Sequence, residues 1–205
     1  TVPCMRWRLP HTAAIAAALE FEEGEAGCLV GIAACSLAIR RGHPGPSAEA
    51  AQSVLQLPGI DSTTRSRLLT ARARLLIKTR QIAEATECAE QAAACATAAP
   101  ISVRVEADIQ VIVIGCFARG AHLEALELLD QWLRTLADGE AEPVSFCKVM
   151  NLRSRIRVGI RHPQAETSLR EALALATRCG LIEARTRAQL ALATWLLLRG
   201  DAATA

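Results

Sequence analysis

The chain has 205 residues, of which 51% are apolar and only 3% aromatic, and its formal net charge is +2. A net charge so close to zero excludes a strong overall attraction to nucleic acid or to an anionic membrane. The apolar residues are mainly Ala, Leu, Ile and Val, and there is no Tyr. Because Ala and Leu are strong helix formers, the composition predicts an all-α protein.

Hydropathy along the chain excludes a membrane-spanning helix. No run of about eighteen apolar residues occurs, and the longest uncharged apolar stretch is "VIVIGCFA" at 111–118. The apolar segment at 12–25 lacks the basic front and cleavage site of a secretory signal. We therefore expect a cytoplasmic protein, and we interpret the sequence, which does not begin with Met, as a fragment of a longer chain.

Helix-breaking turns recur along the sequence with a period near forty residues. The steps are 38, 40, 42 and 38 residues when they are measured between Gly42, Arg80, Gly120, His162 and Gly200. A second break falls about halfway through each interval. Two helices per forty residues, joined by short turns, are typical of α-solenoids. The pattern predicts one helical-repeat domain over 1–205, a right-handed α-solenoid of about five helix-turn-helix hairpins.

The helices of these hairpins are delimited by capping and breaking residues. Asp61 and Ser62 can cap the helix that follows them, Pro residues stand at helix entries, and Gly residues stand just past helix ends. First helices are expected at 26–41, 62–79, 102–119, 144–161 and 181–199, second helices at 47–56, 82–97, 121–137 and 164–178, and an N-terminal capping helix at 11–23.

Several residue types that often carry chemistry are assigned to structure instead. Trp132 and Trp195 are expected in the core, because the helix at 121–137 has two apolar stripes and so two neighbours. His43, His122 and His162 fall at equivalent turns. The eight Cys residues lack zinc-type spacing, and we expect reduced thiols that act as small buried hydrophobes.

Charge is segregated between adjacent helices. The segment 67–80 contains five basic residues and no acid, whereas the next helix contains Glu84, Glu87 and Glu90 and no base. Helical-wheel positions put Arg72 and Arg153 near the apolar arcs of their helices. We expect each of these two arginines to pair with an acid on a neighbouring helix, and the three glutamates are the candidates for Arg72.

Arg157 lies beside Arg153 at the edge of its apolar arc. Two stripes lie away from the arcs, one of Arg67, Arg74 and Lys78 and one of Lys148 and Arg155. The first helices of the pairs usually line the concave face of a repeat array, and an arginine fork binds carboxylate or phosphate in a bidentate manner. A solvated face with ion pairs between helices remains the alternative interpretation. The candidate ligand contacts on the concave basic face are Arg67, Arg74, Lys78, Arg153, Arg155 and Arg157.

Catalytic and nucleotide-binding motifs do not occur. No Gly-rich phosphate loop, catalytic triad or converging pair of carboxylates is found, and the basic segments lack the interleaved aromatic residues typical of RNA binding. We expect neither an enzyme nor a cofactor or metal site, and no direct nucleic-acid or membrane binding by this segment.

Two segments carry a resemblance to a known family. "RSRLLTARARLLIKTRQIAEATECAEQA" at 65–92 and "SLREALALATRCGLIEARTRAQLALATWLLLRGDAATA" at 168–205 resemble tetratricopeptide-like repeats. They are most similar to the forty-residue variety in LuxR-type large ATP-binding transcriptional regulators, the class of the maltose-regulon activator. That resemblance implies a sensor arm, with the ATPase and DNA-binding domains elsewhere in a parent chain.

These observations favour a non-catalytic binding or sensor module of a bacterial signal-responsive transcriptional regulator. Its partner would be a protein, a peptide or a small anionic inducer, and self-association is possible. The alternative is a stand-alone tetratricopeptide-like adaptor or scaffold for protein–protein interaction.

Overall fold

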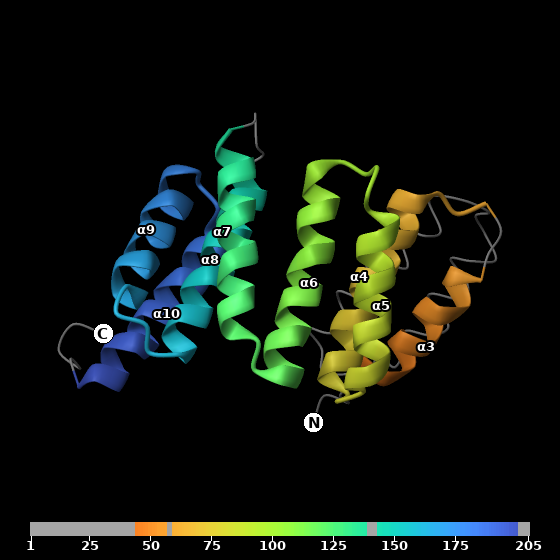
Figure 1. Ribbon diagram of the computed structural model, residues 1–205, viewed down its shortest axis with the longest axis horizontal. Helices are drawn as coiled ribbons and strands as arrows, with labels where there is room; N and C mark the ends of the chain where they lie inside the picture. Colours follow the sequence, from red (N-terminus) through yellow and green to blue (C-terminus); the bar gives the residue numbers. More distant parts are fainter. Residues whose placement is uncertain (1–43, 57–58, 139–142, 201–205) are drawn as a thin grey trace, which may run out of the picture. The chain divides into compact units, whose positions relative to one another are not determined.

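The structure, a computed structural model, describes residues 44–56, 59–138 and 143–200 (Figure 1). In these ranges the regular secondary structure is α-helical throughout, which confirms the all-α part of the predicted fold class. The described helices are α3 (Pro44–Leu55), α4 (Ser62–Lys78), α5 (Ile82–Cys95), α6 (Ile101–Arg119), α7 (His122–Ala137), α8 (Pro143–Gly159), α9 (Ala165–Arg178) and α10 (Ile182–Arg199).

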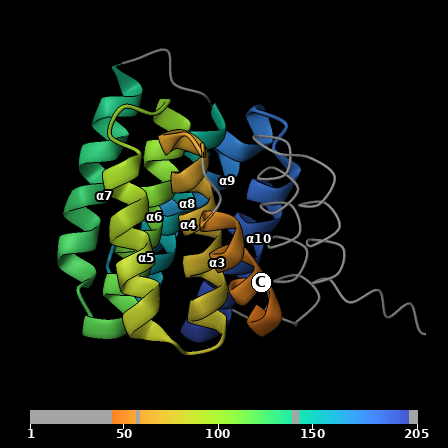
Figure 2. The same cartoon turned by 90° about the vertical axis from the view of Figure 1, so that its right-hand side faces the viewer.

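Every helix that was predicted within the described ranges is present. The largest difference is at α3, which begins at Pro44 instead of residue 47, and the other ends agree within two residues. The predicted helices at 11–23 and 26–41 lie outside the described residues. Consecutive helices pack as antiparallel pairs, and Figure 2 shows α4 and α5 running alongside one another.

The chain divides into two compact units, Thr1–Ile114 and Gly115–Ala205. In the first unit, α4 packs against both α3 and α5. Small and medium-sized side chains fill this core, and α6 contributes to it as well. Its buried members include Leu68, Leu75, Leu76, Ala85, Cys88, Ala89, Ala92, Val103, Ala107 and Ile114.

In the second unit, α8 packs against α7, α9 and α10, and α9 also packs against α10. Buried Met150, Ala172 and Ala188 form a core cluster with partly buried residues of α7, α8 and α9. Alanines at these contacts let the helix backbones approach closely, which explains why an Ala-rich sequence forms helical pairs.

The start of α4 is set by a side-chain cap, as the sequence predicted. The carboxylate of Asp61 accepts hydrogen bonds from the backbone N–H groups of Thr63 at 2.8 Å and Thr64 at 3.0 Å. These two donors would have no partner inside the helix. Hydrogen bonds from Thr64, and less strongly from Thr63, hold the pKa of Asp61 below its ordinary value.

The first helices of the pairs end in a recurring left-handed residue. Positive φ angles occur at Arg80 (62°), Gly120 (66°), Arg161 (54°) and Gly200 (85°). The intervals are 40, 41 and 39 residues, so the period inferred from the sequence has a backbone counterpart. A left-handed residue at this position ends a helix by turning its last carbonyl groups towards new donors.

Two of these turns share one hydrogen-bond pattern. The N–H of Gln81 donates to the carbonyl of Leu76 at 2.9 Å, and the N–H of His162 donates to the carbonyl of Arg157 at 2.8 Å. This bond, from the third residue after a helix back into its last turn, is the Schellman motif. The α4–α5 and α8–α9 connections are therefore built alike.

Burial in these two hairpins is also equivalent, residue by residue. Each residue of 83–98 has the same degree of burial as the residue 80 positions later in 163–178. A shift of 81 residues relates α4 to α8 and preserves most positions. The buried pairs at the α5–α9 correspondence are Ala85 and Ala165, Cys88 and Ser168, Ala89 and Leu169, Ala92 and Ala172, and Ala96 and Ala176.

The tryptophans are less buried than predicted, whereas the described histidines lie at the predicted turns. Trp132 and Trp195 are half-buried, so they cover the core without being enclosed by it. His122 is the first residue of α7 and His162 lies in the α8–α9 turn, as predicted, whereas His43 lies outside the described residues.

Candidate functional site

The candidate residues on α4 belong to one face of that helix. Arg67, Arg74 and Lys78 are separated by seven and four residues, which returns to the same side of an α-helix. Arg67 and Lys78 are exposed, and Arg74 is half-buried. Within the first unit, α4 therefore presents two exposed cations at positions flanking a partly covered third one.

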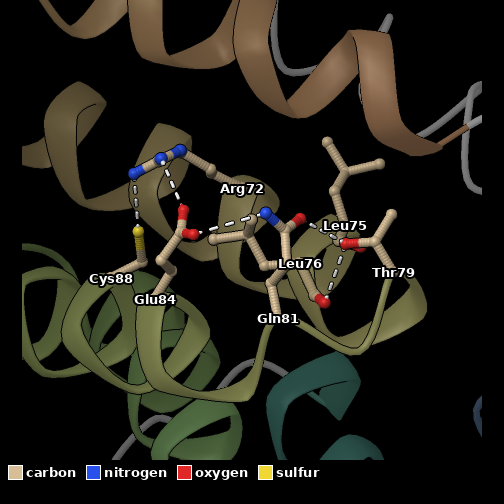
Figure 3. A network of polar contacts seen from close by, with 7 residues as sticks. All are labelled: Arg72, Leu75, Leu76, Thr79, Gln81, Glu84 and Cys88. Atoms are coloured by element: carbon tan, nitrogen blue, oxygen red, sulfur yellow. Dashed lines mark hydrogen bonds and ion pairs between the residues drawn. The ribbon is translucent and has the colours of Figure 1, made fainter.

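Arg72 points instead towards α5, where it forms the predicted ion pair (Figure 3). Its Nη2 lies 3.5 Å from a carboxylate oxygen of Glu84, and its Nη1 donates to the sulfur of Cys88 at 3.0 Å. Glu84 is about half exposed, so water screens this pair and its contribution to stability is small, about 0–1 kcal/mol. The pair fixes the orientation of the arginine more than it stabilises the fold.

Hydrogen bonds connect Glu84 of this ion pair to the turn between α4 and α5. The amide nitrogen of Gln81 donates to Glu84 at 3.3 Å, and the hydroxyl of Thr79 donates to the Gln81 side-chain oxygen at 2.7 Å (Figure 3). The Thr79 hydroxyl also lies 3.0 Å from the carbonyl oxygen of Leu76. Polar side chains thus connect the end of α4 to the start of α5.

The candidate residues on α8 are divided between two environments. Arg155 is exposed, as a stripe residue should be. Arg153 and Arg157 are one turn apart on another side of α8, with Arg153 half-buried and Arg157 only 8% exposed. The wheel placed both at the edge of the apolar arc; in the structure, packing covers Arg157 almost completely.

Arg153 forms the second predicted pairing between helices. Its Nε lies 2.8 Å from a carboxylate oxygen of Asp130, on α7. The N–H is not aligned with that oxygen, so this Nε makes no hydrogen bond among the described residues. The contact is therefore an attraction between charges that leaves a buried donor open.

Arg157 also has an open donor. Its Nε is buried and finds no hydrogen-bond acceptor in the described part of the chain. Burial and the nearby positive charge of Arg153 lower the pKa of Arg157, whereas Asp130 and Glu171 act in the opposite direction. A buried donor without an acceptor costs about 1–3 kcal/mol, and a charged one costs more. The buried Nε donor of Arg157 therefore lowers the stability of the fold at this part of α8.

Cations recur at matching positions of the two hairpins. With the shift of 81 residues, α4 and α8 have basic residues at three shared positions, although their core residues differ. The matched pairs are Arg67 with Lys148, Arg72 with Arg153, and Arg74 with Arg155. Arg157 has no such counterpart, because its position in α4 is occupied by Leu76.

The described thiols differ in burial, and Cys95 and Cys116 are half-buried. Cys88 and Cys147 are buried, as expected for small hydrophobes, whereas Cys179 is exposed, which contradicts that expectation. Burial, with a smaller effect of neighbouring Cys179, raises the pKa of Cys147 to about 11. Within the described residues, no three His, Cys, Asp or Glu side chains gather in a way that could hold a metal ion.

Sequence reasoning missed two of these relationships. Asp130 was not singled out as the partner of Arg153, although its position on the helix before α8 offered a signal. The closeness of Cys147 and Cys179 had no signal, since the two residues are 32 positions apart on different elements.

Comparisons with known proteins add no family to this description. Neither the protein-family models, nor the curated proteins, nor the solved structures include a match to the chain. Among the described helices, none combines the length and the apolar character that crossing a bilayer requires.

Proposed function

We propose that the chain is a non-catalytic binding module, a right-handed α-solenoid of about five hairpins that recognises an acidic partner. One observation carries the proposal: α4 and α8 have cations at three equivalent positions in hairpins of the same construction. In a repeat array equivalent helices present equivalent faces, so each of the two hairpins exposes its own set of cations. Arginine and lysine there attract carboxylates and phosphates.

The exposed cations of α4 are Arg67 and Lys78, the exposed cation of α8 is Arg155, and we name these three residues the basic stripe. On the same two helices, Arg72 and Arg153 are held by ion pairs with Glu84 and Asp130. The acids on α5 and α7 thus orient the inner arginines. They leave the stripe residues as the first contacts for a protein, a peptide or a small anionic inducer.

The resemblance to the repeat arm of LuxR-type regulators gives this module a context in transcriptional regulation. In that setting, a ligand on the stripe acts by population shift: it favours the arrangement of hairpins that it binds more tightly, in proportion to its difference in affinity. No catalytic step is required of the module.

The proposal is tested with a defined acidic probe. Fluorescein-labelled poly-L-glutamate is titrated with the protein, and binding is followed by fluorescence anisotropy at several salt concentrations. We expect saturable binding that weakens with salt, and a loss of at least tenfold in the R67E/R155E variant. Helicity, measured by circular dichroism, should not change, because both side chains are exposed.

The matched control is R134E/R178E, which makes the same change in net charge at exposed residues of α7 and α9. This variant should bind the probe nearly as well as the original protein. An equal loss in both variants would show that only net charge attracts the probe and would reject the basic stripe. A compact scattering envelope in small-angle X-ray scattering would separately reject the solenoid.

A further inference from the structure

The second unit contains a polar cluster at positions where the first unit is apolar. The shifts of 81 and 80 residues that relate the two hairpins pair Ser154 with Ala73, Arg157 with Leu76, and Ser168 with Cys88. All six residues are buried. At these three positions the α8–α9 hairpin therefore buries two hydroxyls and a guanidinium. The α4–α5 hairpin buries a methyl, a thiol and an isobutyl group there.

The guanidinium at Arg157 is not required by the hairpin itself. Leu76 fills the equivalent position in α4 at 2% exposed, and the backbone hydrogen bonds that end the helix are the same in both hairpins. Replacing a leucine by an arginine in such a position introduces a charge that packing separates from water. Such a charge requires compensation from its surroundings.

The described residues compensate for it incompletely. Arg157 lies near Arg153, a second cation, and the Nε atoms of both side chains are buried without a hydrogen-bond acceptor in the described part of the chain. Asp130 lies within ion-pair distance of Arg153, and Glu171 on α9 is exposed. Two adjacent guanidinium groups with buried Nε donors thus have one carboxylate within ion-pair distance, that of Asp130, and a second, that of exposed Glu171, near enough to act on Arg157.

We propose that Arg153 and Arg157 form a binding site for a small oxyanion between α7, α8 and α9. An oxyanion supplies both quantities that the cluster lacks, namely negative charge between two cations and acceptor oxygens for two buried N–H donors. The inference rests on the proposed function of the chain as a binding module, and it names the class of inducer that the second unit takes. Phosphate and carboxylate groups share the required chemistry, and the experiment separates them.

The experiment measures thermal unfolding by circular dichroism in sodium phosphate, sodium acetate and sodium chloride at equal ionic strength. We expect phosphate, acetate or both to raise the melting temperature by several degrees above chloride, with saturation at millimolar concentration. Calorimetric titration with inorganic phosphate and with acetate then gives the dissociation constant of each. The ion with the larger effect identifies the oxyanion.

The decisive variant is R157L, which restores the residue of the first unit. We expect it to fold and to melt at the same or a higher temperature than the original protein in chloride, while its oxyanion binding weakens at least tenfold. The matched control R178L makes the same chemical change at an exposed position near the opposite end of the α8–α9 hairpin, and it should bind as the original protein does.

A second variant keeps the test decisive if R157L folds poorly. D130N removes the carboxylate that competes for Arg153, so it should bind the oxyanion more tightly. No difference between the oxyanions and chloride, or unchanged binding in R157L, would overturn the site. Poor folding of R157L together with unchanged or weaker binding in D130N would assign Arg157 a structural role. None of these outcomes alters the poly-L-glutamate test of the basic stripe, which uses other residues.

Discussion

The hydroxyl oxygens of Ser154 and Ser168 lie 3.0 Å apart at the buried contact between α8 and α9. The Ser154 hydroxyl is also 2.8 Å from the carbonyl oxygen of Met150 and 2.9 Å from that of Ser168. Both side chains are almost completely shielded from water. This pair therefore links the two helices through polar groups that have no access to solvent.

Removing one member of this pair should be costly. S154A leaves the Ser168 hydroxyl buried without its partner, and we expect a loss of about 1–3 kcal/mol in the free energy of unfolding. The measurement is urea unfolding followed by circular dichroism. The double variant S154A/S168C reproduces Ala73 and Cys88 of the first unit and should lie closer to the original protein than S154A does. A double variant that loses the sum of the two single changes would contradict this coupling.

The left-handed arginines make a second prediction. Arg80 and Arg161 have φ angles of 62° and 54°, a region that costs a residue with a Cβ about 1–2 kcal/mol. Glycine adopts this region without that cost but loses about 0.5–1 kcal/mol through the entropy of its unfolded chain. R80G and R161G should each raise the free energy of unfolding by about 0.5–1 kcal/mol in urea titrations.

The control for these changes is G120A, at a position with a φ of 66°. Nothing lies within 4 Å of the Cβ that alanine would add at Gly120, so backbone strain alone should destabilise the variant. Stabilisation by G120A, or destabilisation by R80G, would show that the left-handed conformation is not what limits stability at these turns.

The repeat was visible in the sequence because helix-ending residues are local signals. Gly120 and Gly200 mark left-handed ends directly, and the period then located the breaks near Arg80 and His162. His162, which marks the fourth break in the sequence, lies one residue after the left-handed Arg161. The sequence could not show which residue of these two turns is left-handed, because an arginine gives no sign of that conformation.

The candidate site was only partly accessible from the sequence. Wheel positions correctly placed Arg72 near an apolar arc, and the acid-only helix that follows supplied Glu84 as its partner. The same wheel could not distinguish Arg153 from Arg157, since both lie at the arc edge. Their different burial depends on how closely α7 and α9 approach α8, and a helical wheel contains no information about neighbouring helices.

The cap of α4 gives a prediction that depends on pH. D61A removes the acceptor of two backbone N–H groups and should cost about 0.5–2 kcal/mol in free energy of unfolding. The hydrogen bonds lower the pKa of Asp61 in the folded state. Its ionised form therefore stabilises the fold fully above the pKa of the unfolded chain, and this contribution is lost as the pH falls through the lowered folded value.

Urea unfolding between pH 2 and pH 7 measures this dependence. The difference in stability between the original protein and D61A should be largest near neutral pH and should shrink on the acid side. The D61N variant keeps an acceptor oxygen but cannot ionise, so its difference from D61A should vary little with pH. A difference between the original protein and D61A that grows as the pH falls would contradict the assignment.

The two neighbouring cysteines of the second unit should differ strongly in reactivity. Cys147 is buried in α8, and burial together with nearby Cys179 raises its pKa to about 11, whereas Cys179 is exposed at the end of α9. Only the thiolate reacts with alkylating reagents. At pH 8 about one Cys147 thiol in a thousand is ionised, and packing shields that fraction from the reagent.

We therefore expect iodoacetamide at pH 8 to modify Cys179 at least a hundredfold faster than Cys147, as measured by peptide mass spectrometry over time. Buried Cys88, which accepts the hydrogen bond from Arg72, should also react slowly, because its pKa is raised by burial. In guanidinium chloride the three rates should become similar, which separates the effect of the fold from that of neighbouring residues. Equal modification of Cys147 and Cys179 in the folded protein would show that the α8–α9 contact opens faster than the reagent reacts, and the buried polar cluster around Ser154 and Arg157 would then be accessible to water as well.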